Sequence, residues 1–169
     1  MSGEIRFRGR DILLDTNLLV ILVVGYTHSM LLKKSRFSDY TILDFELLKS
    51  IVSSCRRCVT TPHIIAEASN ILKKAGEHSE VCRETLGRML GSWKECYFAS
   101  ESLLTGPESR IAITLGVADA STMRVAKKGT IILTADAPLA AWLKQNGHKV
   151  YEYSVLRQLQ DKLIRGLNG

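Results

Sequence analysis

Four carboxylates of this chain stand in sequence contexts that could do metal chemistry: Asp15, Glu67, Asp119 and Asp136. Carboxylates that converge within a few ångströms repel one another and are partly protonated unless a cation joins them. Oxygen-only ligands select hard ions such as Mg2+ or Mn2+. Such ions activate water and stabilise both the attacking and the leaving oxygen of a phosphodiester. If the four side chains meet, their types predict a divalent-metal site that cleaves phosphodiester bonds.

Asp15 and Asp136 each close an apolar run that is typical of a buried strand. Asp15 follows residues 12–14 in "DILLD", and Asp136 ends "IILTAD". Ligands of open parallel sheets bind beyond the carboxyl ends of the strands. Both carboxylates are therefore expected at the same edge of one sheet.

Glu67 and Asp119 are expected on helices. Glu67 shares a helical face with Ile64 and Ile71, and a carboxylate within an apolar stripe is costly unless it is paired or bound to a cation. Asp119 follows a break at Gly116, at the head of a helix, from which it can point to the strand ends. Both side chains are therefore candidates for the same site.

A structural alternative exists for each of these residues. Asp15, Asp119 and Asp136 each precede a helical pattern, where aspartate is a preferred N-cap that also suits the helix dipole. Glu67 lies too deep in its helix to cap it, and Thr61 fills that role, so a buried ion pair is its alternative. The joint pattern favours the metal site over capping alone.

The elements that must position these residues alternate between short apolar runs and longer helical patterns. Near-continuous apolar strands between helices predict a parallel sheet covered on both faces, in one α/β domain of residues 1–169. Strands are predicted over 11–15, 58–62, 95–99, 130–136 and 149–153, and helices from about 17 and over 38–54, 62–76, 79–93, 107–116, 119–129, 138–147 and 154–163. The irregular stretch 25–39 is predicted to be an exposed loop or lid.

The composition is that of a soluble globular protein, with 46% hydrophobic and 24% charged residues. A formal net charge of +6 weakly favours polyanionic partners. The unbroken apolar run 18–24 is shorter than the about 20 residues of a membrane-spanning helix, so no membrane is expected. Four cysteines without a secretory signal predict a reducing cytoplasm. The pair Cys55 and Cys58, with Cys82 and Cys96, leaves a zinc site as the alternative to ordinary reduced thiols.

Four segments occur along the chain in the order "ILLDTNLLV", "TTPHIIAEASNIL", "LGVADASTMRVA" and "IILTADAPLAAWL". In these segments and their order, over roughly residues 11–153, the chain resembles the PIN-domain family of metal-dependent nucleases. The resemblance implies a three-layer αβα sandwich around a five-stranded parallel sheet of order 3-2-1-4-5. It also implies that Asp15, Glu67, Asp119 and Asp136 bind Mg2+ or Mn2+, and that Asn17 and Thr134 brace them through hydrogen bonds.

The function that this resemblance implies is an endoribonuclease acting on single-stranded or structured RNA and leaving 5′-phosphate and 3′-hydroxyl ends. Many small members are toxins neutralised by a cognate antitoxin, and homodimers are common. Here the segment 25–44 is longer than in the compact toxins, and "TADAPLA" lacks a further acidic residue and an aromatic residue found in toxin members. An RNA-processing role therefore stays open beside the toxin role.

Two other functions are weighed against this hypothesis. A catalytically silent RNA-binding or protein-docking module would keep the fold without turnover. A phosphatase of the haloacid-dehalogenase type needs a second aspartate two positions after the first, where this chain has Asn17. Four basic pairs are candidates to hold an RNA backbone, although cations also suit solvated helix ends. They are Lys33–Lys34, Arg56–Arg57, Lys73–Lys74 and Lys127–Lys128.

Overall fold

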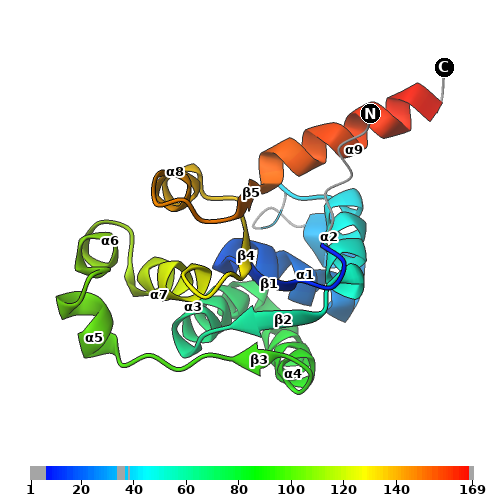
Figure 1. Cartoon of the computed structure of the whole chain (residues 1–169). Coiled ribbons are helices and arrows are strands. Elements are labelled where there is room, and N and C mark those ends of the chain that lie inside the picture. The colour runs from blue at the N-terminus through cyan, green and yellow to red at the C-terminus, as the bar shows by residue number, and fades with distance from the viewer. Residues whose placement is uncertain (1–6, 34–36, 38, 168–169) are drawn as a thin grey trace.

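Five parallel strands in the order β3-β2-β1-β4-β5 form the centre of the molecule (Figure 1). The computed structural model describes residues 7–33, 37 and 39–167. The predicted α/β fold with a parallel sheet of order 3-2-1-4-5 is confirmed. The strands are β1 Asp11–Leu14, β2 Arg57–Thr60, β3 Lys94–Glu95, β4 Ile131–Thr134 and β5 Val150–Glu152.

The centre of the sheet is buried because its strands are apolar on both faces. Ile12 of β1 lies opposite Cys58 of β2 and Ile131 of β4, and these three side chains are at most 5% exposed. A strand flanked by neighbours and covered on both sides has no solvated face, so a continuous apolar run is what it requires.

Helices cover the sheet on both sides and complete the three-layer sandwich. In Figure 1, α2 and α4 lie on one side of the sheet, and α7 and α8 lie on the other. Helix α1 contacts α2, α3 and α4, whereas α7 contacts α3 and α8. The helices are α1 Thr16–His28, α2 Ile42–Ser54, α3 Pro62–Leu72, α4 Ser79–Leu90, α5 Ser100–Thr105, α6 Ser109–Thr114, α7 Val117–Ala126, α8 Ala137–Gln145 and α9 Tyr153–Leu167, with 3-10 turns η1 Ser29–Lys33 and η2 Lys73–His78.

In the third quarter of the chain one predicted strand is too long and one helix was not predicted. The strand predicted over 95–99 is only the two-residue β3. The Cys96 N–H donates the last hydrogen bond to β2, at the Thr60 carbonyl, and the chain then leaves the edge of the sheet, so that the Tyr97 side chain is 74% exposed. Residues 100–105 then form α5, a six-residue helix that no periodicity in the sequence predicted. Both errors concern elements too short to carry a repeat.

The predicted exposed loop over 25–39 is also wrong for much of its length. Residues up to His28 continue α1, and Leu31 and Leu32 of η1 are buried. Helix α2 packs so closely on α1 that a β-carbon on Gly25 would lie 2.1 Å from Phe45. Residues 34–36 and 38 lie outside the described residues.

Helix α1 and η1 together form an apolar stretch, Thr16–Lys33, that passes for a membrane-spanning helix by length and composition. In this structure most of the stretch is buried among the sheet and the helices α2, α3 and α4. Residues 18–25 are all buried, which explains why this part of α1 is apolar around the whole helix. The stretch therefore serves as the central helix of the core.

Candidate metal centre

Asp15 lies where β1 and β4 end side by side. Its Oδ1 accepts a hydrogen bond from the Leu18 N–H at 2.9 Å, and its Oδ2 accepts from Thr134 Oγ1 at 2.5 Å and from the Ala135 N–H at 2.6 Å. Strand β2 pairs with one edge of β1 and β4 pairs with the other, so the strand order reverses between β1 and β4. Such a switch point is where open α/β sheets bind ligands. The side chain is only 5% exposed.

Asp136 follows β4 and lies beside Asp15. Its Oδ1 accepts from the Leu139 N–H at 2.8 Å, so Asp136 caps α8 just as Asp15 caps α1. The capping interpretation is correct for both residues. It uses one oxygen of each, and among the described residues no group donates to the second oxygen of Asp136. Capping and cation binding are therefore compatible here.

Asp119 is not an N-cap, so that interpretation is wrong for this residue. It is the third residue of α7, whose N-cap is Gly116 with φ of 131°. A β-carbon on Gly116 would meet Asp119 Oδ2 at 4.0 Å. No hydrogen bond to the Asp119 carboxylate comes from the described part of the chain, which leaves both of its oxygens available.

Electrostatics couples Asp119 to the other three carboxylates. Burial and then the nearby charges of Asp136, Glu67 and Asp15 raise the pKa of Asp119 to about 7. Burial also raises the pKa of Asp15, against the opposing effect of its three hydrogen bonds. Asp119 therefore lies near enough to each of the other three predicted residues to be affected by its charge.

Glu67 differs from its prediction, because it is exposed instead of buried in an apolar stripe. Ile64 and Ala68 turn into the core, and the Glu67 side chain reaches toward α1 instead. There its Oε2 accepts a hydrogen bond from Thr16 Oγ1 at 2.6 Å. The alternative of a buried ion pair is wrong, since no Lys, Arg or His within 7–33, 37 and 39–167 pairs with it.

Asn17 and Thr134 have different surroundings. Thr134 donates to Asp15 as expected, and it also accepts from the Asp136 N–H at 2.9 Å. The Asn17 side chain makes no hydrogen bond to any described residue. Instead it is exposed and lines a cavity of about 230 Å³ together with Val20, Ile21, Phe37, Asp39, Tyr40 and Ile71.

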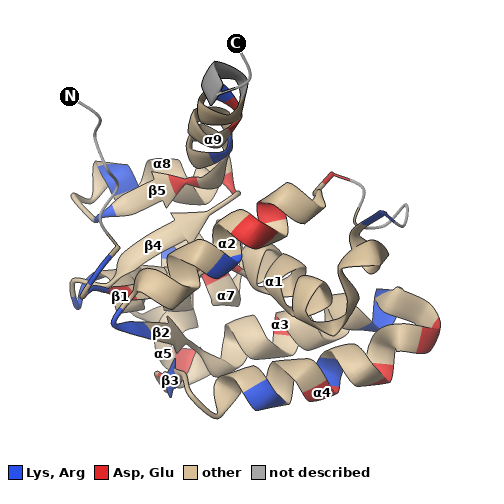
Figure 2. Cartoon of the chain, turned by 90° about the vertical axis from the view of Figure 1, so that its right-hand side faces the viewer, with Lys and Arg blue, Asp and Glu red and all other residues tan. Residues whose placement is uncertain are grey.

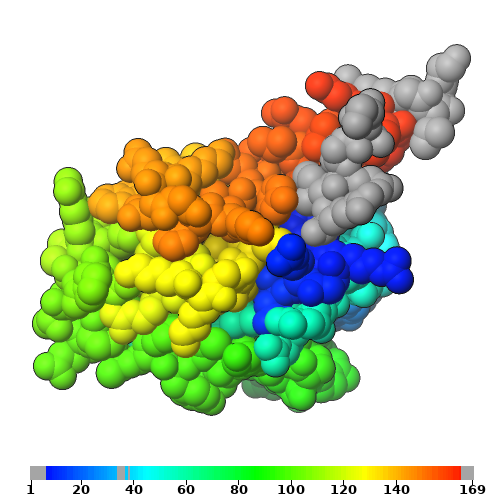
Figure 3. Space-filling view, viewed as in Figure 1, coloured from blue at the N-terminus to red at the C-terminus, as the bar shows by residue number. Residues whose placement is uncertain are grey.

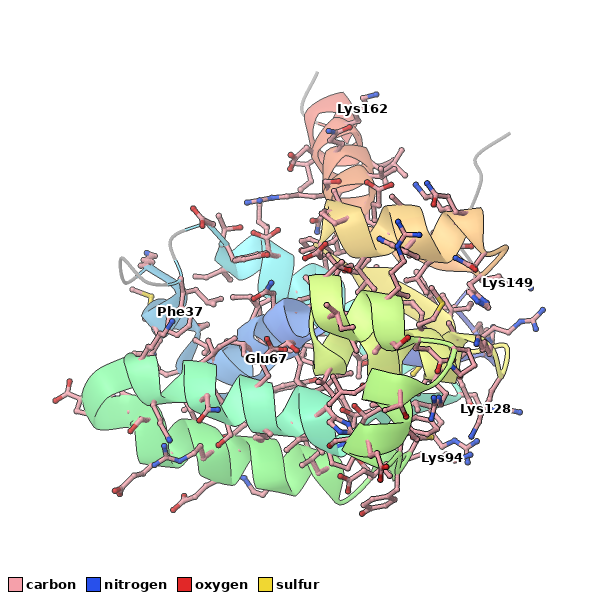
Figure 4. All side chains as sticks on the ribbon, turned by 90° about the vertical axis from the view of Figure 1, so that its left-hand side faces the viewer. Phe37, Glu67, Lys94, Lys128, Lys149 and Lys162 are labelled. Carbon is pink, nitrogen blue, oxygen red and sulfur yellow. The ribbon has the colours of Figure 1, made fainter. Side chains whose placement is uncertain are left out.

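This cavity adjoins the carboxylates. The phenol of Tyr40 has a raised pKa because it is half-buried and because Asp15 and Asp44 lie near it. In Figure 4, Phe37 and Glu67 lie on the same side of the molecule, away from Lys128 and Lys149. Sequence reasoning missed Thr16 and Tyr40. The place of Thr16 beside Asp15 was the only signal for either of them.

The donor set suits a hard divalent cation. Among the described residues no three Asp, Glu, His or Cys side chains are gathered around one point in this conformation. Burial and the charges of the other three carboxylates nevertheless raise the pKa of Asp119, and within the described ranges no cationic side chain forms an ion pair with any of the four. Oxygen donors with uncompensated negative charge are what Mg2+ and Mn2+ prefer. A bound ion would draw these side chains together.

No three cysteines gather around one point in the described part of the chain. Cys55 and Cys58 Sγ atoms lie 3.6 Å apart, and burial raises the pKa of both thiols. Cys82 is buried in α4. In the metal-free protein these raised pKa values keep the two thiols protonated.

The predicted backbone-binding pairs fall in separate places. Arg56–Arg57 and Lys127–Lys128 lie at the amino ends of β2 and β4, on the edge of the sheet opposite the carboxylates. Lys73–Lys74 lie in η2. Lys33 ends η1, and Lys34 lies outside the described residues. None of the described pairs lines the cavity beside Asn17.

No protein-family model matches the chain, and a comparison with curated proteins finds no match to it. The function therefore has to follow from the chemistry of the residues at the carboxyl edge of the sheet.

Proposed function

We propose that the protein is a Mg2+- or Mn2+-dependent endoribonuclease that hydrolyses phosphodiester bonds of single-stranded RNA at the carboxyl edge of its sheet. The observation that supports this most strongly is the raised pKa of Asp119, about 7, caused by burial and by three neighbouring carboxylates. Such repulsion at a switch point, with no cationic side chain of the described ranges paired to these carboxylates, is what a divalent cation would relieve.

The four carboxylates would have different roles in this reaction. Asp15, Asp119 and Asp136 would hold the cation, and Asp15 is held in place by three hydrogen bonds. Glu67, fixed by Thr16, would be a further ligand or would orient the attacking water. When bound, the cation lowers the pKa of water and stabilises charge on the phosphate oxygens.

The cavity beside Asn17 supports a single-stranded substrate. It carries the half-buried ring of Tyr40, which lies near Asp15. An unstacked nucleobase can enter such a cavity and stack on a ring, whereas a base inside a duplex cannot. The scissile phosphate would then lie at the carboxylates.

A cleavage assay with matched variants tests this proposal. Labelled single-stranded RNA is incubated with purified protein in Mn2+ or in EDTA. Wild type should cleave only with Mn2+. The cleavage rate of Asp119→Asn should be at least about a hundredfold lower, as expected when an electrostatic catalytic group is lost. The rate of Asp161→Asn should match that of wild type. Asp161 is an exposed carboxylate on α9, so it controls for the loss of one charge.

The spacing of the carboxylates favours a second candidate, a catalytically silent RNA-binding module. Within the described ranges no three ligands converge without a rearrangement. A protein that binds diverse RNAs, cleaves none of them with Mn2+ or Mg2+, and shows no change in melting temperature with millimolar metal would be this module. Metal-dependent cleavage that Asp119→Asn abolishes would exclude it.

A further inference from the structure

Cations precede or begin the strands at the amino edge of the sheet, the edge opposite the carboxylates. Because all five strands are parallel, their amino ends lie along one side of the molecule. Figure 3 looks onto this side, where blue, turquoise, yellow and orange segments meet. We call this surface the amino edge and define it by six exposed residues: Arg8, Arg10, Arg56, Arg57, Lys128 and Lys149.

Backbone contacts hold these residues close together. The Arg56 N–H donates to the Arg10 carbonyl at 2.9 Å, and the Ile132 N–H donates to the Lys149 carbonyl at 3.0 Å. Arg8 forms a bridge with Cys55. A cavity of about 130 Å³ joins three of the cations, and its lining is Gly9, Arg10, Asp11, Arg56, Lys128, Gly129 and Thr130. Figure 2 shows the blue cationic residues gathered around the starts of β1 and β2.

The amino edge keeps a surplus of positive charge. Its carboxylate is Asp11, which accepts from Arg56 Nε and Arg57 at 2.9 Å each, and these partners lower its pKa to about 2. The neighbouring Lys127 is paired with the buried Glu108, so it is not one of the six cations that define the amino edge. Arg8, Arg10, Lys128 and Lys149 form no ion pair with any residue in the described ranges. Among the described residues of the amino edge, six cations therefore face one carboxylate.

We propose that the amino edge binds the sugar-phosphate backbone of RNA, away from the candidate metal centre. From β2 to β5 it spans three strand spacings, about 14 Å, so it forms a strip and not a single anion pocket. Guanidinium and ammonium groups that lack carboxylate partners gain affinity by neutralising phosphates. Binding of this kind needs neither metal nor cleavage, so it goes beyond the proposed nuclease.

The composition of the amino edge favours RNA over a membrane surface. Surface-bound proteins bury large apolar side chains next to their cations. The large apolar side chains that are exposed in the described part of the chain are elsewhere, on α1, η1, α2, α4, α5, α6, α9 and at Tyr97. Lys128 instead lies over the Phe98 ring at 5.1 Å, which limits its freedom and lowers the cost of ordering it.

Fluorescence anisotropy in EDTA tests the proposal with labelled polyuridine of about twenty nucleotides. The test variant is Arg10→Glu/Lys128→Glu. The control variant is Lys73→Glu/Lys74→Glu, which makes the same charge change in η2, beyond the about 18 Å length of α4 from β3. Circular dichroism and thermal melting confirm that both variants are folded.

Wild type should bind with a Kd that weakens as salt rises. The test variant should bind at least about tenfold more weakly, and its slope of log K against log salt should fall by about 1.4, for two lost phosphate contacts. The control should stay within about threefold of wild type. Equal losses in both variants, an unchanged test variant, or binding to phosphatidylserine vesicles without RNA binding would overturn the proposal.

Failure of this proposal differs from failure of the nuclease proposal. A protein that binds RNA through Arg10 and Lys128 but never cleaves would leave the amino edge intact and remove the enzyme. Metal-dependent cleavage with RNA binding that is indifferent to Arg10 and Lys128 would do the reverse.

Discussion

The Thr134 hydroxyl joins the two carboxylate-bearing residues that follow β1 and β4. It donates to Asp15 Oδ2 at 2.5 Å and accepts from the Asp136 N–H at 2.9 Å. One buried side chain therefore fixes the spacing between two residues that are 121 positions apart in the sequence. Any ligand bound between them would depend on this hydroxyl.

Replacing Thr134 by Val should loosen this link while keeping the volume of the side chain. Asp15 would lose a donor and the Asp136 N–H an acceptor, so we expect a loss of about 1–3 kcal/mol in unfolding free energy. Metal-dependent cleavage should fall as well, and Thr134→Ser should restore most of both quantities. Urea unfolding and cleavage rates measure the two effects. If Val and Ser behave alike, the hydroxyl has no role.

Asp119→Asn should stabilise the metal-free protein, because it removes a carboxylate that three others repel. Its melting temperature in EDTA should exceed that of wild type, and its gain with millimolar Mn2+ should be smaller, since binding to the native state stabilises by mass action. Asp161→Asn should respond to Mn2+ as wild type does. Asp15→Asn is less informative, because its amide would face the N–H and O–H donors that the carboxylate accepts.

The stability of the metal-free protein should depend on pH through Asp119. Its pKa is about 7 in the folded state against 3.8 for the ordinary group, so between these values the folded state binds more protons. Stability must then fall as pH rises from about 4 to 7, by an amount on the order of 2–4 kcal/mol, and stay level above that range.

Two histidines act in the opposite direction. Burial lowers the pKa of His63 and His148, and a lowered histidine pKa makes stability rise with pH up to about 6.5. The comparison is therefore the difference in urea unfolding free energy between wild type and Asp119→Asn, in which the histidines cancel. This difference should grow in favour of the variant from pH 4.5 to 7, and Mn2+ should abolish it. A constant difference would contradict the raised pKa.

The central part of the fold could be predicted from the sequence because its signals are local. Buried strands such as "IILT" are continuous apolar runs, and Thr61 with Pro62 marks the start of α3. The two-residue β3 could not be predicted in the same way, because its pairing with β2 depends on the position of the end of α4 in the folded chain and not on a local sequence pattern. The segment 25–33 was misread because its polar residues are scattered while Leu31 and Leu32 pack inward.

Asp15 and Asp136 lie at the same edge of the sheet, as expected, because both follow parallel strands, whereas the site that they would form with Glu67 and Asp119 stays a prediction. Their surroundings were not predictable. Glu67 was predicted to be buried because its helix is amphipathic, but a side chain at the margin of an apolar face can turn to the core or to solvent. The hydrogen bond from Thr16 to Glu67 joins residues 51 positions apart and leaves no periodic signal.

The contact between Gly25 and Phe45 gives the last prediction, on the packing of α1 against α2. A β-carbon at position 25 would lie 2.1 Å from Phe45 Cδ2, so Gly25→Ala must displace the ring or the helix. We expect a loss of about 1–3 kcal/mol in unfolding free energy, although alanine is the better helix former.

Phe45→Leu alone should also destabilise the protein, because it leaves a void. The double variant Gly25→Ala/Phe45→Leu should lose less than the sum of the single losses, since the added methyl group enters the space that the ring vacates. Urea unfolding of the four proteins measures this coupling, and strictly additive losses would show that α1 and α2 do not meet at this point.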